Sequence, residues 1–387
     1  MLHLAVLTDS PATLEAADHV TREAGLFEII YRAAPTGTTI PALIRTLQTH
    51  DPDLILVDLS GDWELTAPLT RRIAECKIRG IVIGFRPAWN QVEKLAYKAG
   101  GVNHLLREPF SPTELETVAY EALHKERGVT NRNIYAFLPA KAGGGCSTVV
   151  LHATAALAAT VSKKVLLIEG DRRSGVYSIM LNLDHARGLD HALAMGNALT
   201  PVEWHQNVVN VSGFDLLTAN PQHRRRIPTW GDYYQLLQFV QNKYHYVLVD
   251  FPEVVNEATA EVVRSARSIF IVCTPEIASM KMARVRVEEL EACEIAHDRI
   301  HVIVNRCEHG GPTVAELEKM LARPVFATLP NEYTQLKAAI AESRLAPEGS
   351  PFAEACNALG RKLAGLPEVL PERSKFGLLR KLSRIAS

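Results

Sequence analysis

Short apolar segments alternate with segments of helical period along almost the whole chain of 387 residues. The first series of apolar runs is LHLAVL, FEIIYRA, DLILVDL, GIVIGF and VNHLL. The second series is NIYAFLPA, KKVLLIEGD, FDLLTAN, YHYVLVDFP, SIFIVCTP, RIHVIVNRC and PVFATLP. Strands that alternate with helices form a mostly parallel sheet with helices on both faces, because each parallel connection needs a crossover. The pattern therefore predicts an α/β fold.

A polar segment, HKERGVTNRN, separates the two series and indicates a domain boundary. The first series has the size of a flavodoxin-like domain, whose ligands bind at the carboxyl ends of the strands. We expect a first domain at residues 1–125, a linker at 126–133, a larger α/β domain at 134–365 and a tail at 366–387. The length of the chain agrees with two or three domains.

Composition excludes several classes of protein. The 42 Lys and Arg nearly balance the 43 Asp and Glu, so binding to nucleic acid over a large surface is not expected. The six cysteines are scattered and show no zinc-site spacing, which predicts reduced thiols. The first segment, MLHLAVLTDSPATLE, lacks a basic start, and no run is long enough to span a membrane. We expect a cytoplasmic protein whose membrane contact, if any, is peripheral.

A glycine cluster follows the first strand of the second series, in NIYAFLPAKAGGGCSTVVLHATAALAA. A strand, a glycine turn and a helix start together place backbone N–H groups around a phosphate. Glycines suit such a turn because a Cβ would block the approach of the phosphate to the main chain. Against the pattern G-x-x-x-x-G-K-[ST], Ala140 replaces the first glycine and Cys146 replaces the lysine. A glycine turn that only caps a helix remains the alternative.

The spacing of the loop resembles the K-G-G-x-G-K-[ST]-[ST] variant of the MinD/ParA class of P-loop ATPases. This resemblance implies a P-loop domain of the SIMIBI/MinD type that binds ATP and Mg²⁺. It also implies that Lys141 reaches across a homodimer interface, formed through the ATP face, to the nucleotide of the partner. The implied nucleotide-binding residues are Lys141, Gly143, Gly144, Gly145, Cys146, Ser147, Thr148 and Asn305.

Four later segments resemble the same class in the same order. KKVLLIEGDRRSG resembles the second strand and switch I, with Glu169 and Asp171 at its acidic positions. YHYVLVDFP places Asp250 like the acid that holds magnesium through water, VIVNRC places Asn305 like the adenine-binding residue, and VFATLPNEYTQLKAAIAESRL resembles the C-terminal strand and helix. By this resemblance Ser147 and Asp250 are the metal ligands. The implied catalytic residues are Asp171 and Lys141, and a helix cap is the alternative role for Asp171.

The cysteine at the lysine position bears on catalysis. A thiol cannot supply the positive charge that a lysine gives to the β- and γ-phosphates. We therefore predict that ATP binds and that hydrolysis is slow.

The first domain resembles the receiver domain of response regulators, on the segment HLLREPFSPTELE and on Asp58 at the phospho-acceptor position. Phosphoryl transfer also requires an acidic pair, a hydroxyl and a lysine. Here the acidic pair is reduced to Asp9 beside Thr8, the hydroxyl position is Gly84, and the lysine position is Glu108. We expect an interaction module whose Asp58 is not phosphorylated.

A degenerate receiver joined to a MinD/ParA-type ATPase resembles the TadZ/CpaE family. This resemblance implies a localisation and scaffold factor for type IVb (Tad, Flp) pilus assembly, at the inner face of the membrane or the cell pole, whose partners are pilus and secretion proteins. A MinD/ParA-like factor for cell division or chromosome positioning, and a response regulator with an ATPase output, remain alternatives. A metabolic enzyme is a more distant one.

The tail is basic and apolar. In KFGLLRKLSRIAS, taken as a helix, the leucines and the isoleucine fall on one side and the cations on the other. Such a segment suits an anionic membrane surface and resembles the C-terminal targeting sequence of MinD proteins. A frayed tail or a helix that docks on a partner remains open.

Overall fold

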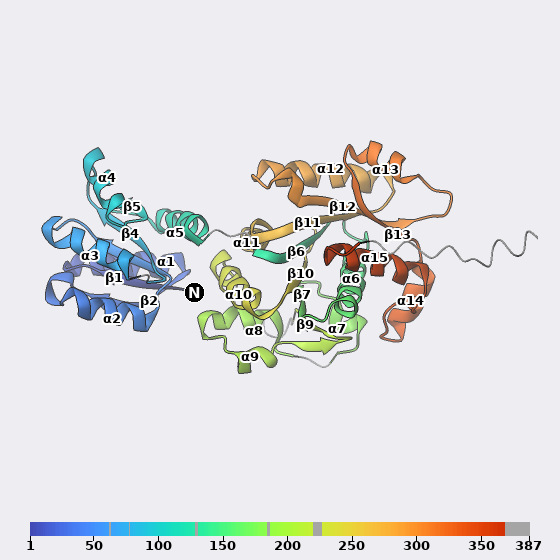
Figure 1. Cartoon of the computed structure of the whole chain (residues 1–387), viewed down its shortest axis with the longest axis horizontal. Helices are drawn as coiled ribbons and strands as arrows, with labels where there is room; N and C mark the ends of the chain where they lie inside the picture. The colour runs from blue at the N-terminus through green and yellow to red at the C-terminus, as the bar shows by residue number, and fades with distance from the viewer. Residues whose placement is uncertain (62, 77, 128–130, 184–185, 220–226, 368–387) are drawn as a thin grey trace, which may run out of the picture.

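The computed structural model describes residues 1–61, 63–76, 78–127, 131–183, 186–219 and 227–367. Their strands form two sheets, one of five strands and one of eight (Figure 1). Every strand pair is parallel except β8 with β9. The prediction of an α/β fold with mostly parallel sheets is confirmed.

The five-stranded sheet has the order β2-β1-β3-β4-β5, which is the doubly wound order of flavodoxin-like domains. Its strands are β1 (Leu2–Leu7), β2 (Phe27–Ala33), β3 (Leu54–Asp58), β4 (Ile81–Arg86) and β5 (His104–Arg107). Its helices are α1 (Pro11–Ala24), α2 (Ile40–His50), α3 (Trp63–Glu75), α4 (Gln91–Ala99) and α5 (Pro112–Arg127), with a 3-10 turn η1 (Pro35–Gly37). Helices α1 and α5 cover one face, and α2, α3 and α4 cover the other.

Local sequence explains where these elements begin and end. The β3 run LILVD is buried at its first four positions, as expected for a central strand covered on both faces. Helix α1 begins after Ser10, whose side chain accepts a hydrogen bond from the N–H of Thr13, and ends at Gly25 in the left-handed conformation. Helix α4 begins with a capping box between Asn90 and Glu93.

The eight-stranded sheet has the order β13-β12-β11-β6-β10-β7-β9-β8. Its strands are β6 (Asn131–Pro139), β7 (Val165–Glu169), β8 (Val209–Val211), β9 (Phe214–Leu217), β10 (Tyr246–Asp250), β11 (Ala266–Cys273), β12 (Ile300–Cys307) and β13 (Val325–Pro330). One face is covered mainly by α8 (Gly188–Met195), α10 (Trp230–Lys243), α11 (Glu257–Ser265), α12 (Ile277–Ala292) and α13 (Val314–Leu321). The other face carries α6 (Cys146–Thr160), α7 (Tyr177–Met180), α14 (Tyr333–Ala341) and α15 (Pro351–Leu363). The remaining short elements are η2 (Gly196–Ala198), α9 (Pro201–His205) and η4 (His297–Arg299).

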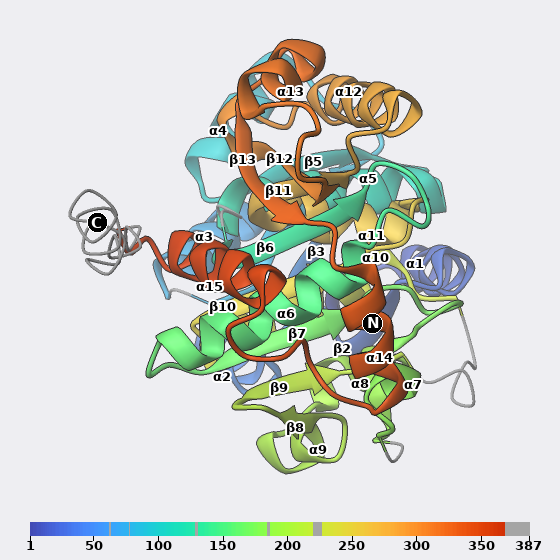
Figure 2. The ribbon, with the colours of Figure 1, turned by 90° about the vertical axis from the view of Figure 1, so that its right-hand side faces the viewer.

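Helix α6 is buried between the sheet and α15 (Figure 2). It is apolar on all sides, as expected for a helix surrounded by protein. The two helices approach closely at Gly360, where a Cβ would lie 2.8 Å from the backbone nitrogen of Leu157. This contact anchors the helix that begins at the glycine loop.

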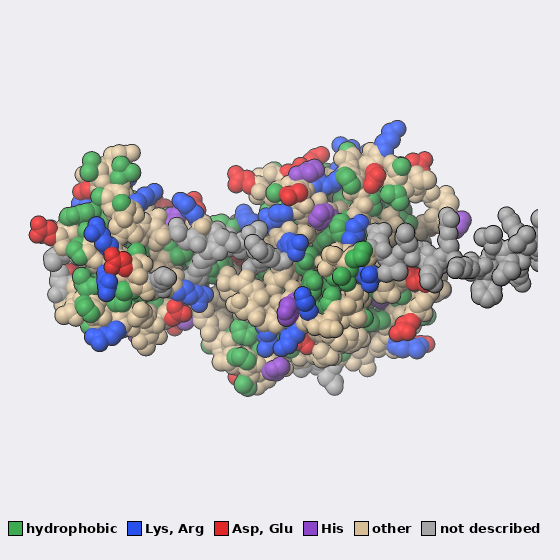
Figure 3. Space-filling view, in the orientation of Figure 1, with side chains coloured by type: hydrophobic (Ala, Val, Ile, Leu, Met, Phe, Trp, Pro, Cys, Tyr) green, Lys and Arg blue, Asp and Glu red, His purple; other side chains and the backbone are tan. Residues whose placement is uncertain are grey.

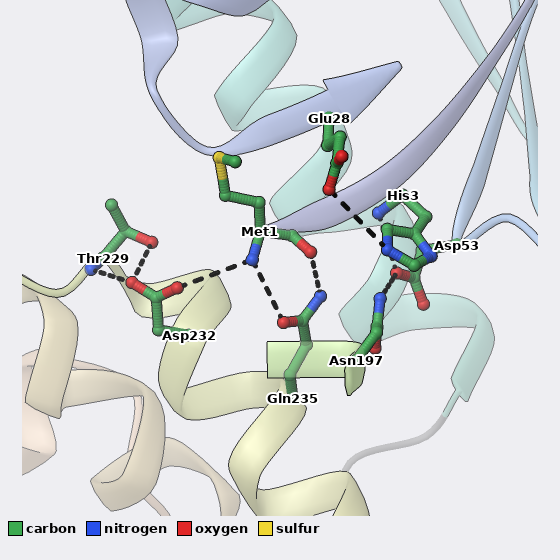
Figure 4. Close-up of polar contacts among 8 residues, drawn as sticks. All are labelled: Met1, His3, Glu28, Asp53, Asn197, Thr229, Asp232 and Gln235. Carbon is green, nitrogen blue, oxygen red and sulfur yellow. Dashed lines mark hydrogen bonds and ion pairs between the residues drawn. The ribbon is translucent and has the colours of Figure 1, made fainter. Parts of the chain in front are cut away.

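The two sheets are joined by a packed interface on α10. The ring of Tyr234 lies in the core of the first domain, and Trp230 packs edge-on against Tyr120 with ring centroids 5.1 Å apart. Polar contacts continue the interface: Asn197 donates to the Asp53 carboxylate, and Gln235 hydrogen-bonds the backbone of Met1 (Figure 4). The first domain therefore contacts the second through side chains as well as through the connecting chain.

Two of the expected segments are described only in part. Helix α5 continues to Arg127 and β6 begins at Asn131, so both elements extend into the segment expected as a linker at 126–133. Of the expected tail at 366–387, all but the first two residues lie outside the described residues. Within the described residues no helix has both the length and the apolar character needed to cross a membrane.

Candidate nucleotide-binding site

The glycine loop connects the carboxyl end of β6, a central strand, to the first turn of α6. Gly143 and Gly145 have φ values of 82° and 83°, a left-handed conformation that glycine adopts readily. A Cβ on Gly143 would meet nothing within 4 Å, whereas one on Gly145 would lie 2.6 Å from Nδ2 of Asn305. The loop therefore leaves open space beside Gly143, three residues before α6 begins, and backbone N–H groups at the amino end of a helix favour an anion.

Asp250 ends β10, between β6 and β7, and is buried beside this loop. Its Oδ2 accepts a hydrogen bond of 2.8 Å from the hydroxyl of Tyr177, and its Oδ1 has no hydrogen-bond partner among the described residues. Burial raises the pKa of Asp250 to about 6, although the Ser147 and Tyr177 hydroxyls favour the ionised form. A buried carboxylate oxygen without a partner is costly unless a cation or a water satisfies it.

Cys146 is the first residue of α6 and is buried beside Asp250. Burial raises the pKa of its thiol well above the ordinary value, and the Asp250 carboxylate raises it further. The thiol is therefore neutral near pH 7 and brings no charge to the loop.

Asn305, near the end of β12, contacts the glycine loop from the neighbouring part of the sheet. Its Nδ2 donates a hydrogen bond of 2.9 Å to the carbonyl of Gly144, and its buried Oδ1 has no partner within the described part of the chain. The structure therefore brings Asn305 and the loop together, although 161 residues separate Asn305 from Gly144.

The two acidic residues after β7 have different surroundings. The buried Glu169 carboxylate accepts hydrogen bonds from the backbone N–H groups of Val176, Tyr177 and Ala219. Burial raises the pKa of Glu169 to about 7, and these donors oppose the rise. Asp171 accepts from the N–H groups of two following residues, each at 2.9 Å, so its carboxylate caps a turn. The catalytic role of Asp171 stays a prediction.

Lys141 lies in the glycine loop, two residues after β6 ends at Pro139. Its side chain is exposed and makes no hydrogen bond or ion pair with any described residue. This position leaves the ammonium available to a second molecule.

Sequence reasoning missed Tyr177 and Arg306. The Tyr177 hydroxyl donates to the Asp250 carboxylate and to the carbonyl of Ser147. The sequence around α7 has no motif from which this contact could be predicted. Arg306 has a left-handed φ of 58°, and its Nη2 lies 3.9 Å from the position that a Cβ on Gly145 would occupy. A cation directly after Asn305 in VIVNRC was the signal that could have identified it.

The residues fit Mg²⁺ and ATP in most respects. No group of three or more His, Cys, Asp or Glu able to hold a metal occurs among the described residues. Mg²⁺ at nucleotide sites needs only one or two protein oxygens besides phosphates and waters, which Ser147 and the unpartnered Oδ1 of Asp250 can supply. The missing feature is the cation at position 146.

No family model matches the chain, and no curated protein matches it. Solved structures do match its second part. A ParA family ATPase from Chlorobium tepidum superposes with a TM-score of 0.55 at 19% identity, over 59% of this chain and 98% of that one. MinD from Aquifex aeolicus gives a TM-score of 0.51 at 22% identity, over 62% of this chain and 100% of that one. MinD from Pyrococcus furiosus gives a TM-score of 0.51 at 18% identity, over 61% of this chain and 100% of that one. The second domain has the MinD/ParA fold.

The matched share of about 60% leaves the first domain outside these comparisons. Its strand ends carry the residues of the expected receiver site. Asp58 Oδ2 accepts a hydrogen bond of 2.7 Å from the Thr8 hydroxyl, and Oδ1 accepts one of 2.9 Å from the N–H of Ser60. The carboxylate of Glu108 accepts from the hydroxyl of Thr13. The Glu108–Pro109 peptide bond is cis.

The space for a hydroxyl side chain at position 84 is filled. A Cβ on Gly84 would lie 2.3 Å from Cδ1 of Leu59, which packs into the place that such a side chain would need. The pocket above Asp58, of about 770 Å³, is also lined by Asp9, and the described residues that line it include no Lys or Arg. A phosphoryl group would meet carboxylates without an opposing cation.

Acetyl phosphate with Mg²⁺ is therefore expected to leave Asp58 unmodified. Intact-protein mass spectrometry measures this directly, and a responsive receiver protein treated in parallel serves as the positive control. A phosphoryl adduct that maps to Asp58 and is lost in Asp58→Asn would contradict the expectation.

Proposed function

We propose that this chain is an ATP-binding protein that dimerises with ATP and acts as a localisation and scaffold factor for type IVb (Tad/Flp) pilus assembly. The observation that carries the ATP-binding part is the buried Asp250 beside the glycine loop, with one carboxylate oxygen that has no partner among the described residues. The pilus role rests on the resemblance of the domain pairing to the TadZ/CpaE family.

Different groups at the loop bind different parts of the nucleotide. The loop N–H groups and the amino end of α6 bind phosphate oxygens, and Asn305 binds the adenine. Ser147 and Asp250 hold Mg²⁺, which when bound neutralises phosphate charge. Arg306 adds positive charge beside Gly145. Because Cys146 adds none, affinity is modest and hydrolysis by Asp171 is slow.

The dimerisation part of the proposal rests on the exposed Lys141 in the same loop. In this proposal the ammonium of one protomer reaches the phosphates bound by its partner, so ATP links the two copies. The first domain, whose Asp58 is expected to stay unmodified, serves as an interaction module for the secretion proteins. Membrane contact, through the tail, is peripheral.

Mg-ATP is expected to shift the wild-type protein from monomer to dimer, and Lys141→Ala is expected to stay monomeric. The alanine variant removes a charge-assisted contact between the copies, which is worth about 1.5–3 kcal/mol and hence at least tenfold in dimer affinity. Light scattering with and without Mg-ATP measures the mass. Lys163→Ala, beyond the far end of α6, is the matched control.

A wild-type mass that ignores Mg-ATP would reject the ATP-dependent dimer. If Lys141→Ala and Lys163→Ala dimerise equally with Mg-ATP, the role of Lys141 is rejected, but the ATP-dependent dimer is not.

The pilus role is tested separately, by the neighbouring genes. Genes for pilin, prepilin peptidase and a secretion ATPase beside this gene support it, whereas division or chromosome-partition genes there favour the alternative positioning role.

A further inference from the structure

Glu253 lies in the segment that joins Asp250, at the end of β10, to helix α11. Its Oε2 accepts a hydrogen bond of 3.0 Å from the backbone N–H of Ala142 in the glycine loop. The two residues are 111 positions apart, and the pairing of β10 with β6 brings them together. A carboxylate of the chain itself therefore binds one N–H group of the loop that is expected to hold phosphate.

The N–H group of Ala142 is available because of the way the loop turns. In a tight turn, the N–H of Gly144 donates to the carbonyl of Lys141 at 3.3 Å, and Gly143 has a left-handed φ of 82°. The hydrogen bond of this turn does not use the N–H groups of its two central residues, Ala142 and Gly143. Open space lies beside Gly143, where a Cβ would meet nothing within 4 Å. A phosphate in this space would lie next to the contact of Ala142 with Glu253, because neighbouring Cα atoms are about 3.8 Å apart.

Helix α12 holds the backbone of Glu253 in place. Nη2 of Arg286 donates a hydrogen bond of 2.8 Å to the carbonyl of Glu253. Nη1 of the same guanidinium pairs with Glu289 at 2.7 Å, so the charge of Arg286 is matched within α12 itself. The carboxylate of Glu253 forms no ion pair with any described residue. Its negative charge therefore stays uncompensated beside the glycine loop.

This charge makes the contact compete with a nucleotide. Phosphate oxygens and the Glu253 carboxylate are both negatively charged acceptors that bind backbone N–H groups. Like charges a few ångströms apart repel each other, and the neutral thiol of Cys146 does not reduce this repulsion. We propose that Glu253 is an internal competitor of the nucleotide phosphates, which occupies the N–H of Ala142 in the free protein and leaves it when ATP binds. This competition presupposes the ATP binding proposed above and sets a threshold concentration for it.

The competition is tested on the full chain by titration with a fluorescent ATP analogue in the presence of Mg²⁺. Glu253→Gln keeps an acceptor oxygen for the N–H of Ala142 but removes the charge. Glu253→Ala removes both the acceptor and the charge. The control is Glu288→Gln, which removes the same charge from an exposed position on α12. Figure 3 shows acidic side chains on the surface over α12 and α13, so the control changes one charge among several.

Both Glu253 variants are expected to bind the analogue about fivefold more tightly than Glu288→Gln. The reason is that a partly exposed contact of a charged group no longer has to be broken before the phosphates bind. A gain limited to Glu253→Ala supports the competition and assigns it to the hydrogen bond rather than to the charge.

Equal affinities of the two Glu253 variants and the control overturn the competition and leave the proposed ATP binding in place. Weaker binding by the Glu253 variants also overturns it, because the contact would then support the loop in the form that binds ATP. If neither the wild type nor any variant binds the analogue, the proposed function fails and the competition fails with it.

Discussion

Cys146→Lys is expected to bind Mg-ATP about tenfold more tightly than the wild type, because it restores a cation at the amino end of α6. A hydrogen bond to a charged group contributes about 1.5–3 kcal/mol, and 1.4 kcal/mol is a factor of ten in affinity. The neutral, buried thiol contributes none of this. Turnover should also rise, since the same charge acts on the transferred phosphoryl group.

The matched control is Cys146→Met, which has an unbranched neutral side chain and adds no charge. Titration with a fluorescent ATP analogue gives the affinity, and release of inorganic phosphate gives the rate. Equal gains from lysine and methionine would show that volume rather than charge matters. If the lysine variant binds no better than the wild type, the loop does not hold phosphates as proposed. Thermal unfolding checks that the lysine, placed beside Asp250, leaves the fold intact.

Gly360→Leu is expected to lower the free energy of unfolding by about 3 kcal/mol, as overpacked cores do. A Cβ at this position would lie 2.8 Å from the backbone nitrogen of Leu157 and 3.0 Å from the carbonyl carbon of Ala156. These are backbone atoms of a buried helix, so they cannot move aside as a side chain can. Helix α15 would have to separate from α6, which carries the glycine loop at its other end.

The control for this change is Ala358→Leu, at an exposed position of the same helix. It adds the same side chain without meeting α6, so its effect should stay within about 0.5 kcal/mol. Urea unfolding followed by circular dichroism measures both variants. If the two leucine variants unfold at the same urea concentration, the close approach of the two helices is wrong.

Several residues of the candidate site could be predicted because short segments of consecutive residues indicate them. Asp250 follows an apolar run, and a residue that ends a central parallel strand lies at the sheet edge where ligands bind. The glycines lie between a strand and a helix, which fixes their place at the same edge. Asn305 and Glu169 were assigned by resemblance to MinD/ParA segments, and the structure shows the Glu169 carboxylate hydrogen-bonded to the backbone of Val176, Tyr177 and Ala219.

Other contacts could not be predicted, because they join residues far apart in the chain. Tyr177 reaches Asp250 across 73 positions, and Arg306 lies beside Gly145 only because β12 neighbours β11 in the sheet. In the first domain, the sequence showed that Gly84 lacks a hydroxyl. It could not show that Leu59 fills the vacant space.

The sequence by itself determined the α/β class, the position of the glycine loop and the absence of its lysine. Each of these is encoded in consecutive residues, through the period of apolar positions or the chemistry of one short segment. Only the tertiary structure decided the strand order, the fit of Gly360 against α6 and the contact of Tyr177 with Asp250. These depend on which distant segments pack together, and that choice is made by the burial of apolar surface over the whole domain.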